Sequence, residues 1–526
     1  MRVFVDNSYS TVPPPPPFPA GSFLCVSGTQ ILNEQDTPVL LRGCGLGGWM
    51  QMENFITGFP GHEIRFREAL LRTLGPDVYK FFFDRYLHHF FNEKDVKLFT
   101  SLGLNCLRIA FDYRHFEDDM DPYVLKPEGF KHLDRVVGMC ARAGVYMILD
   151  LHAVPGGQNP SWNCNNVTSH AAFWDHKTHQ DRAIWLWRKI ADRYKDNSWV
   201  AGYNPLNGPA DRSYMATKLV GWYQRVEQAI REVDSKHILF WDGNTLATDW
   251  NGFETLSPDG YGGYKKAGIF SNSAYSCHDY GVYGFPQSEQ YTGTPEQKKV
   301  LRDTYESKVS FMKRNNLCIW NGEFGPVYAN EEDDGPDWLA INISRMDMLE
   351  YQLQLYESEN ISWSIWLWKD IGNQGMVYTP PNSPWITLLH DWLQKKRKLN
   401  LDYWGNRPQP DVVALFKPIE EWIDREAPAA KYTYPLTWGV KRHVMRGVTE
   451  TFLSDSLQGV FSGYFDGKTD TQLEELLSSF SLREGEYEEG KEEGGKSSGE
   501  GWAVQRGYLN ALLKQYAGRS RGMIGV

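Results

Sequence analysis

Short apolar runs alternate with stretches of helical periodicity along most of this chain. In the helical stretches, apolar positions recur every three to four residues; Phe130–Ala143, Asp181–Tyr194, Met215–Val233 and Asp347–Glu357 are examples. The apolar runs have the length and composition of buried strands. They are Leu40–Gly45, Asn105–Ala110, Val145–Leu151, Val200–Asn204, His237–Trp241, Ser273–Tyr280, Leu317–Phe324 and Ile361–Trp368. Eight strands that alternate with helices predict an α/β fold, the (β/α)8 TIM barrel.

A doubly wound nucleotide-binding sheet is the competing fold. Gly43, Gly45 and Gly48 match the spacing GxGxxG. That fingerprint needs a helix that opens directly after the glycines, and Trp49–Glu53 carries no helix start signal. The barrel is therefore the favoured architecture.

Two further segments lie at the start of the chain, before most of the predicted barrel. Residues 1–20 include the proline run Pro13–Pro17, which predicts an extended arm. Residues 23–42 alternate in polarity around a polar turn at Asn33–Asp36 and predict an N-terminal hairpin. We expect the barrel and this hairpin to occupy residues 21–400.

The remaining residues, 401–526, predict a mainly helical appendage. Helical periodicity returns at Val412–Arg425, Thr449–Phe465, Thr471–Phe480 and 502–517. Residues 483–499 are acidic, glycine-rich and of low complexity, so we expect this segment to be disordered. We interpret the appendage as a wall of the barrel's pocket, because no compact β-rich pattern indicates a separate binding module.

Composition narrows the class of partner. The net charge is −11 and no basic patch is present, which excludes a typical nucleic-acid-binding protein. Aromatic residues make up 14% of the chain, and their rings stack on sugars as well as filling cores. No stretch reaches membrane-spanning length and the first residues lack a signal-peptide core, so we expect a cytoplasmic location. The oligomeric state is left open.

Neither the cysteines nor the histidines have the spacing of metal ligands. The seven cysteines are scattered without a CxxC pair. His152 and His278 do not belong to an HxH or HExxH motif. We therefore expect no metal and no other cofactor.

Polar and aromatic side chains gather where the predicted strands end. In a (β/α)8 barrel the active site lies at the C-terminal ends of the strands, so these positions predict one shared site. A single histidine or arginine has an ordinary structural explanation, but agreement across six strands favours a functional site. The side chains are Arg108, His152, Asn207, His278, Tyr280, Glu323, Trp366 and Trp368.

Several motifs have counterparts in one enzyme family. Ile319–Gly325 (IWNGEFG) and Val200–Asp211 (VAGYNPLNGPAD) resemble the strand-seven and strand-four signatures of glycoside hydrolase family 5, whose members are retaining glycosidases. Arg42–Trp49 (RGCGLGGW) and Asp150–Asn159 (DLHAVPGGQN) resemble further segments of its exoglucanase-like members. The resemblance covers about residues 36–400.

The resemblance implies a role for each side chain of the predicted site. Glu323 occupies the position of the nucleophile, and Gly208 occupies the position of the acid/base, which is a glutamate in the family. Arg108 corresponds to the arginine that keeps the nucleophile ionised. The remaining positions correspond to residues that contact the sugar or flank the two carboxyl groups: Glu53, His152, Asn207, His278, Tyr280 and Trp366, with Trp368 as the alternative platform.

Glycine at the acid/base position changes the expected chemistry. A retaining glycosidase needs two carboxyl groups about 5–5.5 Å apart, and glycine supplies none. Three explanations are open: an engineered knockout of an active enzyme, which we favour; a natural pseudo-enzyme that binds sugar; or an acid supplied by Asp211 or Glu331.

For the substrate, the motifs favour an exo-acting β-glucosidase of small glycosides or glycolipids. An endo-acting glucanase or mannanase and a non-catalytic carbohydrate-binding protein are the alternatives.

Overall fold

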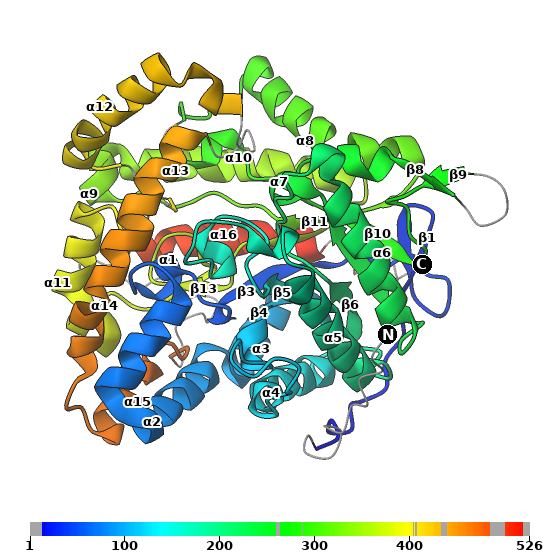
Figure 1. Ribbon diagram of the computed structural model, residues 1–526, viewed down its shortest axis with the longest axis horizontal. Helices are drawn as coiled ribbons and strands as arrows, with labels where there is room; N and C mark the ends of the chain where they lie inside the picture. Colours follow the sequence, from blue (N-terminus) through cyan, green and yellow to red (C-terminus); the bar gives the residue numbers. More distant parts are fainter. Residues whose placement is uncertain are drawn as a thin grey trace.

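The structure is a computed structural model (Figure 1). It describes residues 13–258, 264–286, 288–402, 404–405, 408–432, 439–483 and 500–518.

Eight parallel strands form a closed barrel, which confirms the predicted fold class. Each strand pairs with the next one along the barrel, and the last pairs with the first. In chain order the strands are β3 (Arg42–Met50), β4 (Cys106–Asp112), β5 (Tyr146–Ala153), β6 (Val200–Asn204), β7 (Ile238–Asp242), β10 (Ser273–His278), β11 (Cys318–Glu323) and β12 (Ser362–Ile365). Nearly every residue of these strands is buried, because helices cover the barrel outside and side chains fill it inside.

Helices surround the barrel wherever the sequence shows helical periodicity. They are α3 (Glu93–Ser101), α4 (Glu128–Arg142), α5 (Lys177–Tyr194), α6 (Thr217–Arg231), α8 (Pro295–Asn315) and α10 (Trp338–Ser358). The long helix α2 (Glu63–Phe90) precedes α3. It kinks at Gly75, which has a φ of 73° and stands directly before Pro76. The connection from β7 to β10 is irregular and holds the short elements α7 (Asn244–Ala247), η6 (Asn251–Glu254), β8 (Leu256–Pro258) and β9 (Tyr264–Lys266) among its described residues.

The N-terminal hairpin exists, but its turn lies earlier than the sequence suggests. Strands β1 (Cys25–Ser27) and β2 (Gln30–Leu32) pair around Gly28, which has a φ of 59°. The predicted turn at Asn33–Asp36 follows the hairpin and brings Leu32 opposite Pro38 through one isolated bridge. Glycine adopts positive φ without a steric penalty, which explains why the tighter turn forms at position 28.

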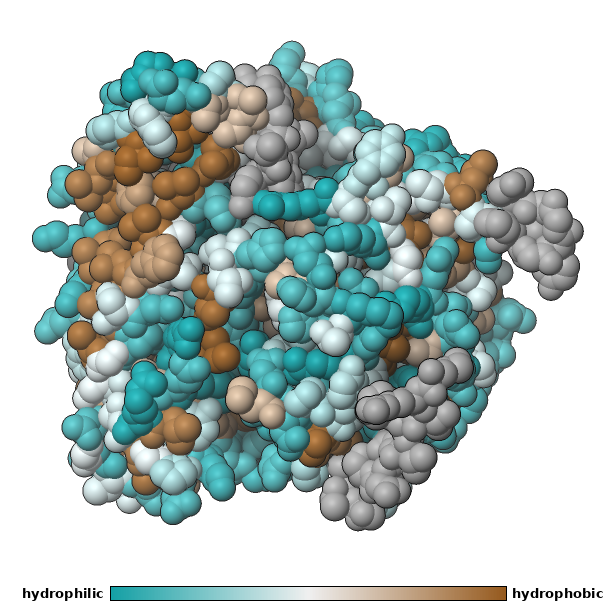
Figure 2. Space-filling view, in the orientation of Figure 1, coloured by the Kyte–Doolittle hydropathy of each residue, from teal (hydrophilic) through white to brown (hydrophobic). Residues whose placement is uncertain are grey.

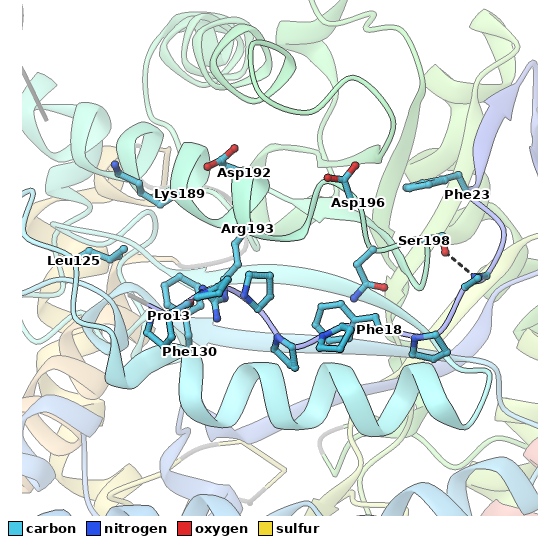
Figure 3. Close-up of a pocket in the computed structure, with 18 of the residues that line it drawn as sticks. Pro13, Phe18, Phe23, Leu125, Phe130, Lys189, Asp192, Arg193, Asp196 and Ser198 are labelled. Carbon is cyan, nitrogen blue, oxygen red and sulfur yellow. Dashed lines mark hydrogen bonds between the residues drawn. The ribbon is translucent and has the colours of Figure 1, made fainter. Parts of the chain in front are cut away.

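The described part of the proline-rich arm lies along α4 and α5 (Figure 3). The Arg193 guanidinium donates a hydrogen bond to the Pro13 carbonyl at 2.9 Å, and the Gly21 amide donates to the Ser198 hydroxyl at 2.9 Å. Pro15 and Phe18 are half-buried, whereas the residues between them are exposed. A spacing of three matches the three residues per turn of a polyproline II helix.

The C-terminal region is helical, as predicted. Its helices α11 (Pro384–Lys398), α12 (Pro410–Glu426), α13 (Val440–Arg446), η11 (Gly447–Leu453), α14 (Ser454–Ser462), η12 (Gly463–Phe465) and α15 (Asp470–Ser478) gather with α2 on the side opposite the N-terminal hairpin (Figure 1). The predicted stretch Thr449–Phe465 is helical throughout but changes type, since η11 is a π-helix, α14 an α-helix and η12 a 3-10 turn. The last helix, α16 (Glu500–Gly518), follows residues 484–499; the acidic segment therefore lies almost wholly outside the described residues.

Apolar side chains are exposed on this side of the molecule (Figure 2). On α12, Leu415 and Trp422 are exposed, and on η11 Phe452 is exposed. Within the described residues, no helix is both long and apolar enough to cross a membrane.

Candidate active site

The predicted polar residues meet at the C-terminal end of the barrel, around Arg108. This residue projects from β4 and is completely buried. One guanidinium nitrogen donates to Glu323 Oε1 at 2.8 Å. The other donates to Asn207 Oδ1 at 2.7 Å and lies 3.1 Å from Asp150 Oδ2. A rigid planar guanidinium fixes all three partners at once, which makes Arg108 the hub of the site.

Glu323, the last residue of β11, has two further partners. The Tyr280 hydroxyl donates to Glu323 Oε2 at 3.0 Å, and His278 Nδ1 lies 3.5 Å from the same oxygen. The register between β10 and β11 shifts between Cys277 and His278, and such an irregularity re-aims side chains at a strand end. Burial raises the pKa of Glu323, but electrostatic interactions with His278, Arg108 and His152 outweigh it and lower the pKa to about 2. The geometry therefore supplies an ionised carboxylate in a nearly closed site.

The low pKa of Glu323 leads to a prediction about pH. An attacking carboxylate must be deprotonated, so the rate of covalent labelling by an activated glycoside should stay constant as the pH falls from 7 to about 3.5. Replacing His278 by Gln removes the interaction that lowers this pKa most and should move the acid limb to higher pH. The labelling rate is measured against pH at fixed ionic strength. A wild-type limb centred on the ordinary value of 4.5 would contradict this electrostatic account.

His152 and Glu53 form the side of the site nearest β3 and β5. His152 Nδ1 lies 2.8 Å from Asp150 Oδ2, and its Nε2 lies 3.0 Å from the Asn207 amide nitrogen. Glu53 Oε1 lies 3.8 Å from His152 Nε2. Burial, followed by repulsion from Glu323 and Asp402, raises the pKa of Glu53 well above its ordinary value. A raised pKa favours the protonated carboxyl group, which donates a hydrogen bond as well as accepting one and so suits a sugar hydroxyl.

The two tryptophans of the strand-eight motif have different surroundings. Trp366 stacks on His152 with ring centroids 5.3 Å apart and an interplanar angle of 9°. Gly45 and Gly47 face its ring so closely that an added Cβ would lie 2.5 Å from it. Trp368 instead donates from Nε1 to Asp95 at 2.9 Å and packs on α3. The structure thus brings Trp366, but not Trp368, to the cluster.

We expect substitutions of the two tryptophans to differ in their effect on sugar binding. Trp366→Ala should weaken the affinity for a thio-glucoside about 5-fold, since stacking on an aromatic face contributes about 1 kcal/mol. Trp368→Ala should lower the free energy of unfolding by about 3–5 kcal/mol and leave the affinity of the folded fraction unchanged. Calorimetric titration and denaturant unfolding measure the two effects. Equal losses of affinity in both variants would refute the assignment of Trp366 as the platform.

Gly208 sits beside this cluster, and its backbone is fixed on both sides. Its amide donates to Asp242 Oδ2 at 2.8 Å, and its carbonyl accepts from the Asn159 amide at 2.9 Å. Its φ is +47°, and an added Cβ would lie 3.3 Å from Leu246 Cδ2. A side chain at this position has room only if Leu246 moves slightly.

Neither sequence candidate for a replacement acid points to the cluster. Asp211 accepts the amides of Ser213 and Leu219 at 2.8 and 2.9 Å and thereby holds the start of α6. Glu331 is exposed at the start of α9 (Glu331–Asp334).

Asp242 belongs to the site although the sequence analysis did not name it. It is the last residue of β7, and that position at a strand end could have predicted it. Its carboxylate lies 3.4 Å from His278 Nε2, and burial raises its pKa.

An aromatic wall near Tyr280 also escaped the sequence analysis. Trp404 packs edge-on against Tyr280 and Phe285, with centroids 5.3 and 5.5 Å away, and contacts Phe55 at 5.9 Å. It lies in the loop after α11, where no periodic pattern marks it. Trp162 lies 6.4 Å from Trp404 and carries the Arg446 guanidinium of α13 over its ring at 3.9 Å. The C-terminal helices therefore contact the loops that surround the site.

Comparison with known proteins identifies the family. The model of Cellulase (glycosyl hydrolase family 5) matches residues 79–372, more than half of the chain. This chain belongs to glycoside hydrolase family 5. A β-xylosidase of Phanerodontia chrysosporium is 46% identical over 464 residues, which cover 88% of this chain and 95% of that protein. A probable glucan 1,3-β-glucosidase A of Neosartorya fischeri is 26% identical and covers 64% of this chain and 84% of its own length.

Among solved structures, that of an endogalactoceramidase matches with a TM-score of 0.47 and 16% identity, and the match covers 66% of this chain and 75% of that one. Family 5 members are glycoside hydrolases, so the substrates of this family are carbohydrates. The barrel of this family 5 chain thus carries an ionised carboxylate on β11, a glycine after β6 and a buried polar network between them.

Proposed function

We propose that this family 5 chain is a retaining β-glycosidase that removes single β-glucosyl or β-xylosyl units, with Glu323 as nucleophile and no resident acid/base. The observation that carries the proposal is the Glu323 carboxylate, which is held by Arg108 and Tyr280 and has a pKa of about 2. Xylose is glucose without its hydroxymethyl group, so one site of this design suits both sugars. The name of the 46% identical relative supports the xyloside.

The proposed reaction depends on the leaving group. Glu323 attacks the anomeric carbon, a bond forms between its carboxylate oxygen and that carbon, and the bond to the aglycone oxygen breaks. A nitrophenolate leaves without a proton, whereas an alkyl or sugar oxygen needs one. General acid catalysis contributes about 10²–10⁴-fold, so natural glycosides are expected to react slowly with Gly208 in place.

The enclosure of the site supports action on a terminal sugar. Glu323 is only 7% exposed, and its partner Tyr280 packs on Trp404, which lies 6.4 Å from Trp162. An open cleft for an endo-acting glucanase or mannanase would leave the nucleophile accessible from both sides. A small glycoside with a compact or apolar aglycone suits the aromatic wall better than a polymer does.

The test uses dinitrophenyl β-glucoside and β-xyloside with azide. Attack by Glu323 inverts the anomeric carbon once and attack by azide inverts it again, so the product should be the β-glycosyl azide. Azide should also raise the rate, because it needs no base to attack the glycosyl-enzyme. An α-glycosyl azide would show that no covalent intermediate forms.

A sugar-binding protein without catalysis is the second candidate, and Gly208 itself is the observation that favours it. Retention of sugar binding with no azide product from either substrate would establish this alternative.

A further inference from the structure

Helix α16 spans the barrel from its catalytic end to its opposite end. Near its start, Arg506 Nε and Asn510 Nδ2 donate to the carbonyls of Gly375 and Met376, at 3.2 and 3.1 Å, in the loop after β12. Near its end, Ala517 and Gly518 lie beside Gly103, where an added Cβ would meet them at 3.6 and 3.5 Å. Gly103 lies three residues before the start of β4, so α16 runs antiparallel to the strands, as barrel helices do.

The neighbours of α16 define its place in the ring of helices. It packs against α10, where the Tyr516 hydroxyl donates to Glu350 at 3.4 Å, and its far end reaches the end of α3. Leu509, Leu513 and Tyr516, at helical spacing, are 2%, 0% and 1% exposed. Figure 1 shows α16 (red) beside β13 (Lys369–Asp370). The helix that directly follows β12 in the chain, α11, instead packs on α15.

Arg506 connects α16 to a tight turn after β12. Its residue is 1% exposed, and its guanidinium lies 3.6 Å from Asp370 Oδ1 and over the Tyr378 ring at 4.5 Å. Asp370 accepts the amides of Gly372, Gln374 and Gly375 at 2.8, 2.6 and 3.0 Å. One buried carboxylate therefore organises the turn, and a buried cation next to it balances its charge.

The turn reaches the active site through Gln374. The side-chain nitrogen of Gln374, Nε2, donates to the backbone carbonyl of Gly325, two residues after Glu323, at 3.1 Å. The side-chain oxygen of Gln374, Oε1, accepts from Trp404 Nε1 at 2.7 Å. Trp404 packs on Tyr280, which donates to Glu323. Gln374 thus contacts both the loop of the nucleophile and the aromatic wall.

We propose that α16 takes the place of the eighth helix of the barrel, although it lies far from β12 in sequence, and that Arg506 is a positioning residue that holds Gln374 through Asp370. Sequence order would assign the eighth helix to α11, and residues 401–526 would then be an accessory. The contacts make the end of the chain part of the barrel instead. The effect on catalysis rests on the proposed function, whereas the structural role does not.

The structural role is tested by hydrogen exchange on the full-length chain. Arg506→Gln should speed exchange of the Gly372, Gln374 and Gly375 amides at least 10-fold, and Tyr508→Ala, at an exposed position on the same helix, should leave it unchanged. In the wild type, α16 should exchange as one cooperative unit with α10. Unchanged protection of the turn in Arg506→Gln, or independent opening of α16, would overturn the proposal. If Arg506→Gln does not fold, Arg506→Lys is used; it keeps the charge beside Asp370, loses the Nε donor to the Gly375 carbonyl, and should speed exchange of the same amides by a smaller factor.

The positioning role is tested by labelling Glu323 with an activated 2-fluoro glycoside. Arg506→Gln should lower the maximal labelling rate about 100-fold and change the reagent's dissociation constant little. Asp370→Asn should cause a similar loss, and the double variant should be no worse than either single one, because both act through one turn. Additive losses, or an unchanged rate in Arg506→Gln, would contradict it. Absence of labelling in the wild type would count against the proposed function and leave the exchange result standing.

Discussion

Replacing Gly208 by glutamate is expected to raise the hydrolysis of an unactivated β-glucoside or β-xyloside by about 10²–10⁴-fold, the contribution of a general acid. Asn207, His278 and Tyr280 already surround Glu323 and Arg108 beside this position. The new carboxyl would protonate the leaving oxygen and then deprotonate water. Hydrolysis of the dinitrophenyl glycosides should rise less, because the first step with these substrates needs no proton.

The backbone at position 208 sets the control for this experiment. A residue other than glycine at a φ of +47° costs about 1–2 kcal/mol, and a Cβ there approaches Leu246 to 3.3 Å. Gly208→Ala introduces the same backbone strain and the same contact without a carboxyl group. Both variants should therefore lose similar stability, while only Gly208→Glu gains activity. Background rates in both variants would exclude an active enzyme that lost its acid and would favour the sugar-binding protein.

The second large effect concerns Glu323. Glu323→Gln in the Gly208→Glu background should reduce turnover at least as much as loss of the acid does, by about 10⁴-fold or more, and should abolish covalent labelling. Glutamine keeps the shape of the side chain, and Arg108 retains Asp150 as its charged partner. The variant should therefore fold and still bind sugar.

A matched control for Glu323→Gln lies in the same site. Glu53→Gln changes another buried carboxyl group, one whose pKa is raised by burial and by Glu323. It should weaken sugar affinity and leave labelling of Glu323 detectable. Equal loss of labelling in Glu53→Gln and Glu323→Gln would remove the basis for assigning the nucleophile.

The sequence predicts the barrel well because each of its strands is a local apolar run followed by a helix of regular period. The strand Val200–Asn204, for example, has the predicted bounds. The hairpin turn was misplaced because Asn33–Asp36 is rich in turn-forming residues, yet Gly28 supplies the positive φ that the tight turn uses. Gly28 and Asn33 both begin segments that favour a turn and lie five residues apart, and composition alone does not show which of them closes the hairpin.

Site residues on strands were easier to predict than those brought in by tertiary packing. Arg108, His152 and Glu323 follow from the register of the barrel, because successive strand ends meet at one face. Trp366 and Trp368 share a spacing of two, so the pattern could not separate them; β12 ends at Ile365, and the chain then takes them to different places. Trp404 lies in a loop without a periodic pattern, and the helical pattern of residues 502–517 predicts the helix that carries Arg506 but not where that helix docks.

The central claim, that Glu323 is the nucleophile of a retaining glycosidase, is tested most directly by mapping the site of covalent labelling. The full-length chain with Gly208 is treated with a dinitrophenyl 2-deoxy-2-fluoro β-glucoside, digested, and analysed by mass spectrometry. The account predicts a single fluoroglycosyl adduct on Glu323, within the segment Ile319–Gly325. An adduct on Glu53, Asp150 or Asp242, or the absence of any adduct while the same chain hydrolyses the dinitrophenyl glucoside, would contradict it.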